Sequence, residues 1–164
     1  MRCVAKVRDV LALMVIAVSA PAVAAAQSLT LQGLAGAPVA ITTQELKALP
    51  HRTVTVAVHG LSGAYSGPPL AALLAKVDAP LGESLHGPAM SDIVVVRACD
   101  GYRVVLTLPD IDPAFLDQAV ILADSVDGHP LDAHEGPFRL IVEGDKRAAR
   151  SARCVVSLTL AAVP

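Results

Sequence analysis

Aromatic side chains are scarce in this sequence: among its 164 residues there is no Trp, and there are only two Tyr and two Phe. Proteins that bind single-stranded nucleic acids or sugars commonly stack the ligand on aromatic rings. The scarcity therefore counts against both classes of ligand. Aliphatic side chains must fill most of the core, since hydrophobic residues of all kinds make up 54% of the chain.

Motifs of several common enzyme and cofactor classes are also missing. The sequence contains no G-x-x-x-x-G-K-[ST], no H-E-x-x-H, no C-x-x-C and no C-x-x-C-H. No motif thus supports P-loop nucleotide binding, zincin proteolysis, thioredoxin-type exchange or covalent haem attachment. The stretch HGLSGA comes near G-x-S-x-G, but Gly63 stands one position too early for a nucleophile elbow. This spacing disfavours a serine hydrolase.

The N-terminus has the pattern of an export signal. Three basic residues precede the apolar run VLALMVIAVSA, and the small residues of PAVAAAQS follow it. An uncleaved anchor is the alternative, but the run is shorter than the about 20 residues that a membrane helix needs. We expect cleavage after Ala26, which makes 1–26 a signal peptide and 27–164 a single domain. The mature protein is expected to be periplasmic or secreted, without stable membrane insertion.

The balance of charge gives no general attraction for polyanions. The formal net charge is −2. Residues 1–26 hold three basic residues and one acidic residue, so their removal leaves ten Lys and Arg against fourteen Asp and Glu, a net charge of −4. A protein with this balance is not expected to bind nucleic acid or acidic lipid surfaces.

Four of the ten remaining cations lie close together near the C-terminus: Lys146, Arg147, Arg150 and Arg153. If 145–153 is helical, their spacing places all four on one broad face. Arginine suits phosphate because its guanidinium can donate two parallel hydrogen bonds. The alternative is a solvated face loosely paired with the aspartates of 110–132, in which each exposed pair contributes only about 0–1 kcal/mol.

Two cysteines, Cys99 and Cys154, remain after signal removal. An oxidising compartment allows a disulfide between them, but two isolated cysteines do not require one. The sequence does not show whether their Cα atoms come within the about 7 Å that a bridge needs. Both the bridged and the free state therefore stay open at this point.

The loop DGHPLDAHEG concentrates potential metal ligands, namely His129, Asp132, His134 and Glu135. A zinc or copper site needs three or four such groups converging at about 2.0–2.2 Å. A polar turn between two strands is the alternative, since an Asp-Gly pair and a proline favour turns. We expect the turn, and no metal ligands are assigned.

The pattern along the chain predicts more strand than helix. Thr42 and Glu45 have the spacing of a capping box that begins a short helix, and Asp100-Gly101 is expected to supply the positive φ angles of a tight hairpin. The expected strands and short helices lie in LTLQGLAGAPVAITTQELKAL, HRTVTVAVHG, YSGPPLAALLAKV, SDIVVVRACDGYRVVLTL, LPDIDPAFLDQAV, VILADSVDGHPLDAHEGPFRLIVEG and CVVSLTLAAV. Without regular strand–helix alternation, they predict an α+β fold.

Four stretches resemble one known family when taken in order: YSGPPLAALL, VVVRACDGYRVVL, VILADSVDGHPLDAHEGPFRLIV and the basic segment with the terminal strand. They are similar to the molybdopterin-binding domain of the sulfite-oxidase-like oxidoreductases. In that family a Y-x-G-x-P-L helix start, a D-G-Y strand and a G-x-P-L…G-P-x-R-L-[IV]-V run recur. The resemblance covers about residues 28–162, and it implies a sheet-rich α+β fold with short helices inserted between strands.

The resemblance also implies a cofactor. Members of the family hold molybdenum through a pterin dithiolene and one cysteine thiolate, which lies on the strand before the Y-x-G-x-P-L element. The corresponding stretch here, TVTVAV at 53–58, contains no cysteine. Cys99 lies on another strand, where a cysteine more often behaves as a small apolar residue. The resemblance thus implies molybdopterin but shows no molybdenum thiolate site, which leaves enzymatic activity open.

Five residues are candidate cofactor ligands because of this resemblance. Asp100 and Tyr102 match the D-G-Y motif. Lys146, Arg147 and Arg150 occupy the basic region where the family meets the phosphate-bearing end of the pterin. No catalytic residue is assigned.

These observations favour an exported protein of this fold that is non-catalytic or accessory and binds a pterin-type or other anionic ligand. Two alternatives remain: a molybdopterin-dependent oxidoreductase subunit, and a protein-interaction module with no small ligand. The expected partners are an anionic small molecule or a redox partner protein, and not nucleic acid.

Overall fold

A computed structural model describes residues 28–58 and 61–163 of the chain. The expected signal peptide and its cleavage site lie outside these residues. In the part of the chain that is described, no helix is long and apolar enough to cross a membrane.

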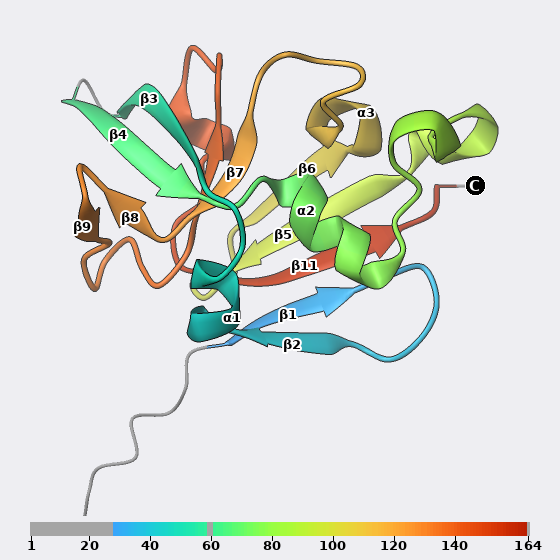
Figure 1. Cartoon of the computed structure of the whole chain (residues 1–164), viewed down its shortest axis with the longest axis horizontal. Coiled ribbons are helices and arrows are strands. Elements are labelled where there is room, and N and C mark those ends of the chain that lie inside the picture. Colours follow the sequence, from blue (N-terminus) through green and yellow to red (C-terminus); the bar gives the residue numbers. More distant parts are fainter. Residues whose placement is uncertain (1–27, 59–60, 164) are drawn as a thin grey trace, which may run out of the picture.

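The largest sheet has five strands in the order β2-β1-β11-β5-β6. β1 pairs with β11 in parallel, and the other neighbours are antiparallel. The pairing places the beginning of the described chain beside its last strand (Figure 1). The strands are β1 (Ser28–Gln32), β2 (Val39–Thr42), β5 (Ile93–Ala98), β6 (Arg103–Thr107) and β11 (Val155–Ala161).

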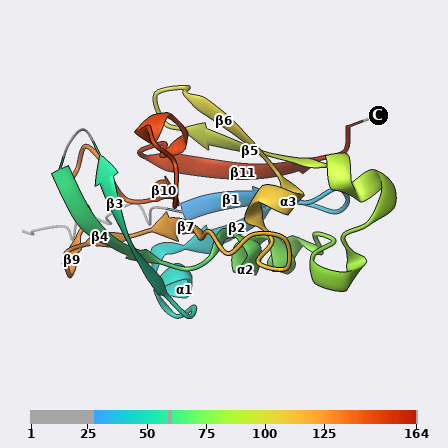
Figure 2. The ribbon, with the colours of Figure 1, turned by 90° about the horizontal axis from the view of Figure 1, so that it is seen from above.

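One face of this sheet forms the main core. Residues alternate between the two faces of a strand, and Leu29, Val94 and Leu158 on the inner face are fully buried. Helix α2 (Leu70–Leu74) lies over that face (Figures 1 and 2). Its residues Leu70, Leu73 and Leu74 are also fully buried and belong to the same hydrophobic cluster. These three leucines hold α2 against the sheet.

Two smaller sheets complete the domain. β10 (Arg139–Val142) pairs with β7 (Val120–Ala123), and the second sheet has the order β3-β4-β8-β9. Its strands are β3 (Arg52–Val58), β4 (Leu61–Gly67), β8 (Ser125–Val126) and β9 (His129–Pro130). A second buried cluster joins these sheets through Val54, Tyr65, Ile121 and Ile141.

The glycine of the Y-x-G-x-P-L motif has a packing role. A Cβ atom at Gly67 would lie 2.1 Å from the carbonyl oxygen of Leu122 and 2.6 Å from the Cα atom of Ala123. Both are backbone atoms, so they cannot swing aside as a flexible side chain can. The motif glycine therefore allows the end of β4 to pass directly against β7.

The short helices follow local sequence signals. α1 (Thr43–Lys47) begins at the predicted capping box, in which Thr42 accepts from the Glu45 amide and the Glu45 carboxylate accepts from the Thr42 amide. α3 (Leu108–Ile111) begins with a second capping box. The remaining helical turns are the 3₁₀ segments η1 (Ala75–Val77), η2 (Gly82–Ser84), η3 (Gly87–Ser91) and η4 (Ala148–Arg150).

Three local expectations need correction. The N-terminal segment contains a strand, β2, that the sequence pattern did not predict, and β4 was likewise missed. The β5–β6 hairpin forms as predicted, but its turn spans Cys99–Tyr102, and only Gly101 in it has positive φ, at 87°. The helix expected over 145–153 does not form, since only η4 is helical there. The sheet-rich α+β class is confirmed.

Candidate ligand-binding site

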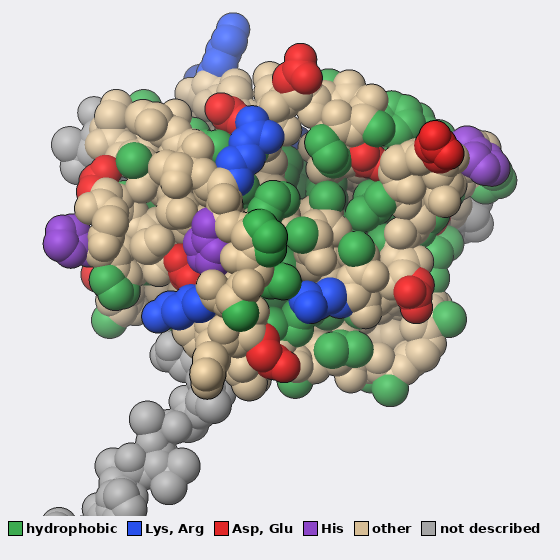
Figure 3. Space-filling model, in the orientation of Figure 1, with side chains coloured by type: hydrophobic (Ala, Val, Ile, Leu, Met, Phe, Trp, Pro, Cys, Tyr) green, Lys and Arg blue, Asp and Glu red, His purple; other side chains and the backbone are tan. Residues whose placement is uncertain are grey.

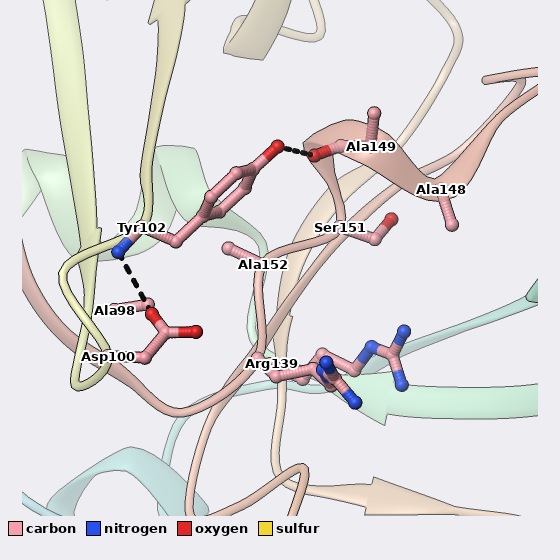
Figure 4. A pocket seen from close by; sticks show the side chains of 9 residues that line it. Ala98, Asp100, Tyr102, Arg139, Ala148, Ala149, Ser151 and Ala152 are labelled. Carbon is pink, nitrogen blue, oxygen red and sulfur yellow. Dashed lines mark hydrogen bonds between the residues drawn. The ribbon is translucent and has the colours of Figure 1, made fainter.

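A cavity of about 200 Å³ lies where the β5–β6 hairpin meets the segment around η4. Figure 4 shows the residues around it. It is lined by Ala98, Asp100 and Tyr102 from the hairpin, by Arg139 from β10, and by Ala148, Ala149, Ser151, Ala152 and Arg153. The hairpin and the region 139–153, which are far apart in the sequence, therefore build this site together.

Two hydrogen bonds of Tyr102 order the hairpin side of the cavity. Its backbone amide donates to Oδ1 of Asp100 at 2.9 Å, and its hydroxyl donates to the carbonyl oxygen of Ala149 at 2.9 Å (Figure 4). The first bond shapes the turn, and the second ties it to η4. Tyr102 thus connects two segments of the site through one side chain.

Arg139, the first residue of β10, is the most deeply buried charge of the site, with 2% of its side chain exposed. Its Nη1 donates to the carboxylate of Glu135 and, at 3.4 Å, to the hydroxyl of Tyr65. The guanidinium carbon lies 5.3 Å from the centroid of the Tyr65 ring. The buried Nε has no hydrogen-bond partner among the described residues, so a charged donor is available inside the protein.

Two pKa shifts describe the surroundings of Arg139. Burial raises the pKa of the Tyr65 phenol, while the charge of Arg139 opposes this shift. The pKa of Asp132 is lowered because its carboxylate accepts hydrogen bonds from the backbone amides of Glu135 and His134. The second interaction holds the loop that carries Glu135, the acidic partner of Arg139.

The structure brings together two of the five residues that the sequence predicted as cofactor ligands. Asp100 and Tyr102 line the cavity. Lys146 and Arg147 are exposed and do not line it. Arg150 points to Asp145, with its Nε and Nη2 atoms 2.9 Å and 2.6 Å from the two carboxylate oxygens.

The shared basic face that a helix over 145–153 would create does not form. No helix aligns the four cations, and the nearby Asp145 carboxylate engages Arg150. The hydrogen bonds to Asp145 also raise the pKa of Arg150. On the face of the molecule seen in Figure 3, Lys and Arg side chains are scattered singly among hydrophobic and acidic ones. The role of Lys146, Arg147 and Arg150 as ligands remains a prediction that the cavity geometry does not support.

The sequence patterns did not single out three cavity residues with donor groups: Arg139, Ser151 and Arg153. One signal for Arg139 was available. It is the arginine of the G-P-x-R-L-[IV]-V run, directly before the apolar residues LIV; the strand RLIV is buried at all four positions, and a buried arginine is almost always paired. Arg153 was counted in the basic segment but not chosen as a ligand. It lies beside Nε2 of His134.

The cysteines form a disulfide with a Cα–Cα distance of 5.6 Å. Ala98, the last residue of β5, pairs with Val155, the first residue of β11. Cys99 directly follows Ala98 and Cys154 directly precedes Val155, so the two cysteines lie opposite each other. The stretch that holds His129, Asp132 and His134 has turns at 127–128 and 133–135 on either side of the short strand β9. Within 28–58 and 61–163, no three His, Cys, Asp or Glu side chains converge in a metal-binding arrangement.

Fold and site together define a small sheet-rich α+β domain with a buried arginine in the wall of a cavity. The sequence pattern of the family described as "Oxidoreductase molybdopterin binding domain" matches residues 17–164. The chain therefore belongs to this family, and the family predicted from the sequence is confirmed.

Solved structures support the same fold. The structure of the sulfane dehydrogenase SoxCD from Paracoccus pantotrophus matches with a TM-score of 0.62 and 21% sequence identity. The match covers 83% of this chain and 39% of that chain, so the present chain spans well under half of the solved one. The comparison with curated proteins gave no match.

The cofactor of the family can be tested against these residues in two parts. The unpaired Nε of Arg139, with Arg153 and Ser151 nearby, fits the anionic, phosphate-bearing end of a pterin. The molybdenum end does not fit, because β3 has no cysteine and both described cysteines are bonded to each other. Cys3 lies outside the described residues.

Proposed function

We propose that this protein is an exported, non-catalytic accessory member of its family, which binds a pterin-type or other phosphate-bearing anion in the cavity around Arg139. The observation that carries this proposal is the buried Nε of Arg139, which has no acceptor among the described residues. An unsatisfied buried donor costs about 1–3 kcal/mol, and more when it is charged. Arg139 lines the cavity, so a ligand oxygen that reaches this donor from the cavity would remove that cost.

The other donors of the cavity support an anion. Arg153 adds a second guanidinium, and Ser151, of which 7% is exposed, adds a hydroxyl. The volume of about 200 Å³ is below the about 300–1,000 Å³ of typical sites for whole drug-sized ligands. This size supports entry of the phosphate-bearing part of a ligand, with the remainder outside the cavity.

Export and an accessory role have separate support. A disulfide persists in an oxidising compartment and is rare in the cytosol, which agrees with the signal pattern in residues 1–26. The same disulfide occupies both described cysteines. Neither of them can then supply the thiolate that soft metal coordination requires, which supports a role other than catalysis at molybdenum.

Calorimetric titration with inorganic pyrophosphate tests ligand binding. Replacing Arg153 by Ala removes an exposed cation of the cavity without opening the core, and we expect the affinity to fall about 10-fold, which corresponds to about 1.4 kcal/mol. Arg97→Ala is the matched control, because Arg97 is exposed on β5 and does not line the cavity. If the unaltered protein binds no pyrophosphate, the proposal is wrong.

Arg150→Ala distinguishes the cavity from the basic segment as the place of binding. With its guanidinium on Asp145, Arg150 should contribute less to pyrophosphate affinity than Arg153. If Arg150→Ala instead weakens binding as strongly as Arg153→Ala, the ligand lies over the basic segment and outside the cavity.

The family match favours a second candidate, a subunit of a molybdopterin-dependent oxidoreductase. Metal analysis of protein purified from its own export pathway separates the two. Stoichiometric molybdenum would favour the oxidoreductase subunit, whereas pyrophosphate-sensitive pterin binding without molybdenum would favour the accessory role.

A further inference from the structure

The disulfide joins two segments that line the candidate cavity. Cys99 stands between the lining residues Ala98 and Asp100, and Cys154 directly follows the lining residue Arg153. The amide of Cys99 also donates to the carbonyl oxygen of Cys154 at 2.9 Å. The bridge thus adds a covalent link to the β5–β11 pairing and the Tyr102–Ala149 hydrogen bond, which also hold the two walls together.

Cys154 also holds the loop that carries the partner of Arg139. Its amide donates to the carbonyl oxygen of Glu135 at 2.9 Å, and the carboxylate of Glu135 pairs with Arg139. Cys154 itself has a φ of 48°, in the left-handed region that residues other than glycine seldom occupy. A conformation of this kind persists only while its surroundings hold it. The bridge and the two backbone hydrogen bonds provide that restraint.

Both residues of the bridge lie at least partly at the surface. Cys99 is exposed, and Cys154 is partly exposed. A thiolate must reach one sulfur of a disulfide to break it, so access governs which disulfides are labile. The bridge therefore combines a position at the cavity with access from outside.

We propose that this disulfide is a redox control of the cavity: the oxidised protein holds the three segments in a binding geometry, and reduction by a dithiol lowers its affinity for phosphate-bearing anions. The proposal rests on the proposed function, because it concerns the same cavity.

The chemistry is ordinary thiol–disulfide exchange. A thiolate of the dithiol attacks Sγ of Cys99 and forms a mixed disulfide, which releases the Cys154 sulfur as a thiolate that then takes up a proton. The second thiol of the dithiol, as its thiolate, displaces Cys99, whose sulfur is protonated in turn. In total, two electrons and two protons pass from the dithiol to the cysteine pair, and the dithiol becomes a disulfide.

Loss of the bridge should weaken binding because the donors lose their common position. Once Cys154 is free to leave its left-handed conformation, Arg153 moves with it, and the hydrogen bond to Glu135 is lost. Arg139, which lines the cavity, then no longer has a fixed acidic partner. Affinity depends on such preorganisation, since a ligand must otherwise order these groups as it binds.

Calorimetric titration of the native chain with inorganic pyrophosphate measures the effect. We expect at least 10-fold weaker binding after reduction with dithiothreitol, and recovery after re-oxidation, with an unchanged far-ultraviolet circular dichroism spectrum throughout. Equal affinity of the oxidised and reduced protein would overturn the proposal.

Hydrogen exchange gives a readout that does not depend on any ligand. The amides of Cys99 and Cys154 should exchange at least 10-fold faster after reduction, whereas those of Val94 and Leu158 in the core strands should not change. If pyrophosphate does not bind the oxidised protein but these two amides respond, the proposed function fails and the restraint by the disulfide stands. If the two amides do not respond, the proposed restraint of these segments by the disulfide is overturned regardless of binding.

A double variant, Cys99→Ala with Cys154→Ala, supplies the permanent reduced-like state. It should bind pyrophosphate as weakly as the reduced native chain and should no longer respond to dithiothreitol. Lys76→Ala is the control, since Lys76 is exposed and does not line this cavity, and it should keep the full response. If the double variant does not fold, the reduction and re-oxidation cycle on the native chain decides the question.

Discussion

Arg139 and Tyr65 form a buried pair in which the guanidinium carbon lies 5.3 Å from the ring centroid. The hydroxyl of Tyr65 accepts from Nη1 of Arg139, but over a long distance of 3.4 Å. The two residues are 74 positions apart in the sequence. Within Tyr65, the ring therefore contributes most of the interaction with Arg139, and the hydroxyl adds little.

Substitution of Tyr65 tests this division. Tyr65→Phe keeps the ring and should lower the free energy of unfolding by about 1 kcal/mol or less, because it removes one long hydrogen bond. Tyr65→Leu removes the ring face and leaves a void, and should lower it by about 2–4 kcal/mol. Urea unfolding curves measure both. Equal losses in the two variants would show that the hydroxyl, and not the ring, supports Arg139.

The raised pKa of the Tyr65 phenol predicts a loss of stability at alkaline pH. Burial disfavours the phenolate, with Arg139 opposing this shift. A group whose folded pKa lies above its unfolded value, about 10 for tyrosine, contributes its full stability below the unfolded pKa and loses it as pH rises through the folded pKa. Urea midpoints of the native chain should therefore fall more steeply above about pH 10 than those of Tyr65→Phe. Parallel pH profiles of the two proteins would contradict this expectation.

Gly67 should not tolerate even one added carbon. In Gly67→Ala the new methyl group would meet the backbone of Leu122 and Ala123, and overpacking of this kind typically costs about 1–3 kcal/mol. The free energy of unfolding should fall by at least this amount, as measured by urea denaturation. Ser62→Ala, at an exposed position of the same strand, is the control and should change stability little. If Gly67→Ala is as stable as the native chain, β4 and β7 have room to separate.

The disulfide should also stabilise the folded domain. It links cysteines 55 positions apart, and bridges of this kind typically contribute about 2–4 kcal/mol by restricting the unfolded chain. Thermal and urea unfolding of a Cys99→Ser, Cys154→Ser double variant should show a loss in this range. Dithiothreitol should shift the native protein by a similar amount and leave the variant unchanged. A shift of the variant by the reductant would point to some other target.

Much of the local structure could be predicted from short stretches. The capping box at Thr42 and Glu45 and the leucine stripe of α2 depend on residues within a few positions of one another. The β5–β6 hairpin likewise follows from two β-rich runs around Asp100-Gly101. The same kind of reasoning failed at 145–153. No helix aligns the cations there, and the carboxylate of Asp145 binds Arg150.

The site could be predicted only in part. Asp100 and Tyr102 of the D-G-Y motif line the cavity, and their role as cofactor ligands stays a prediction. The partner of the Tyr102 hydroxyl, however, lies 47 positions away at Ala149. The pairing of Cys99 with Cys154 was open because it follows from the register of β11 against β5, in which Val155 lies opposite Ala98. Neither relationship leaves a trace in the spacing of nearby residues.

The sequence by itself determined the family, the sheet-rich α+β class and most of the short elements, because these depend on ordered motifs and on preferences that act over a few neighbouring residues. Only the tertiary structure decided which arginine is buried with a free donor, which cations stay outside the cavity, and that the two cysteines meet. Strand register and core packing control those features, and they bring together residues that are distant along the chain.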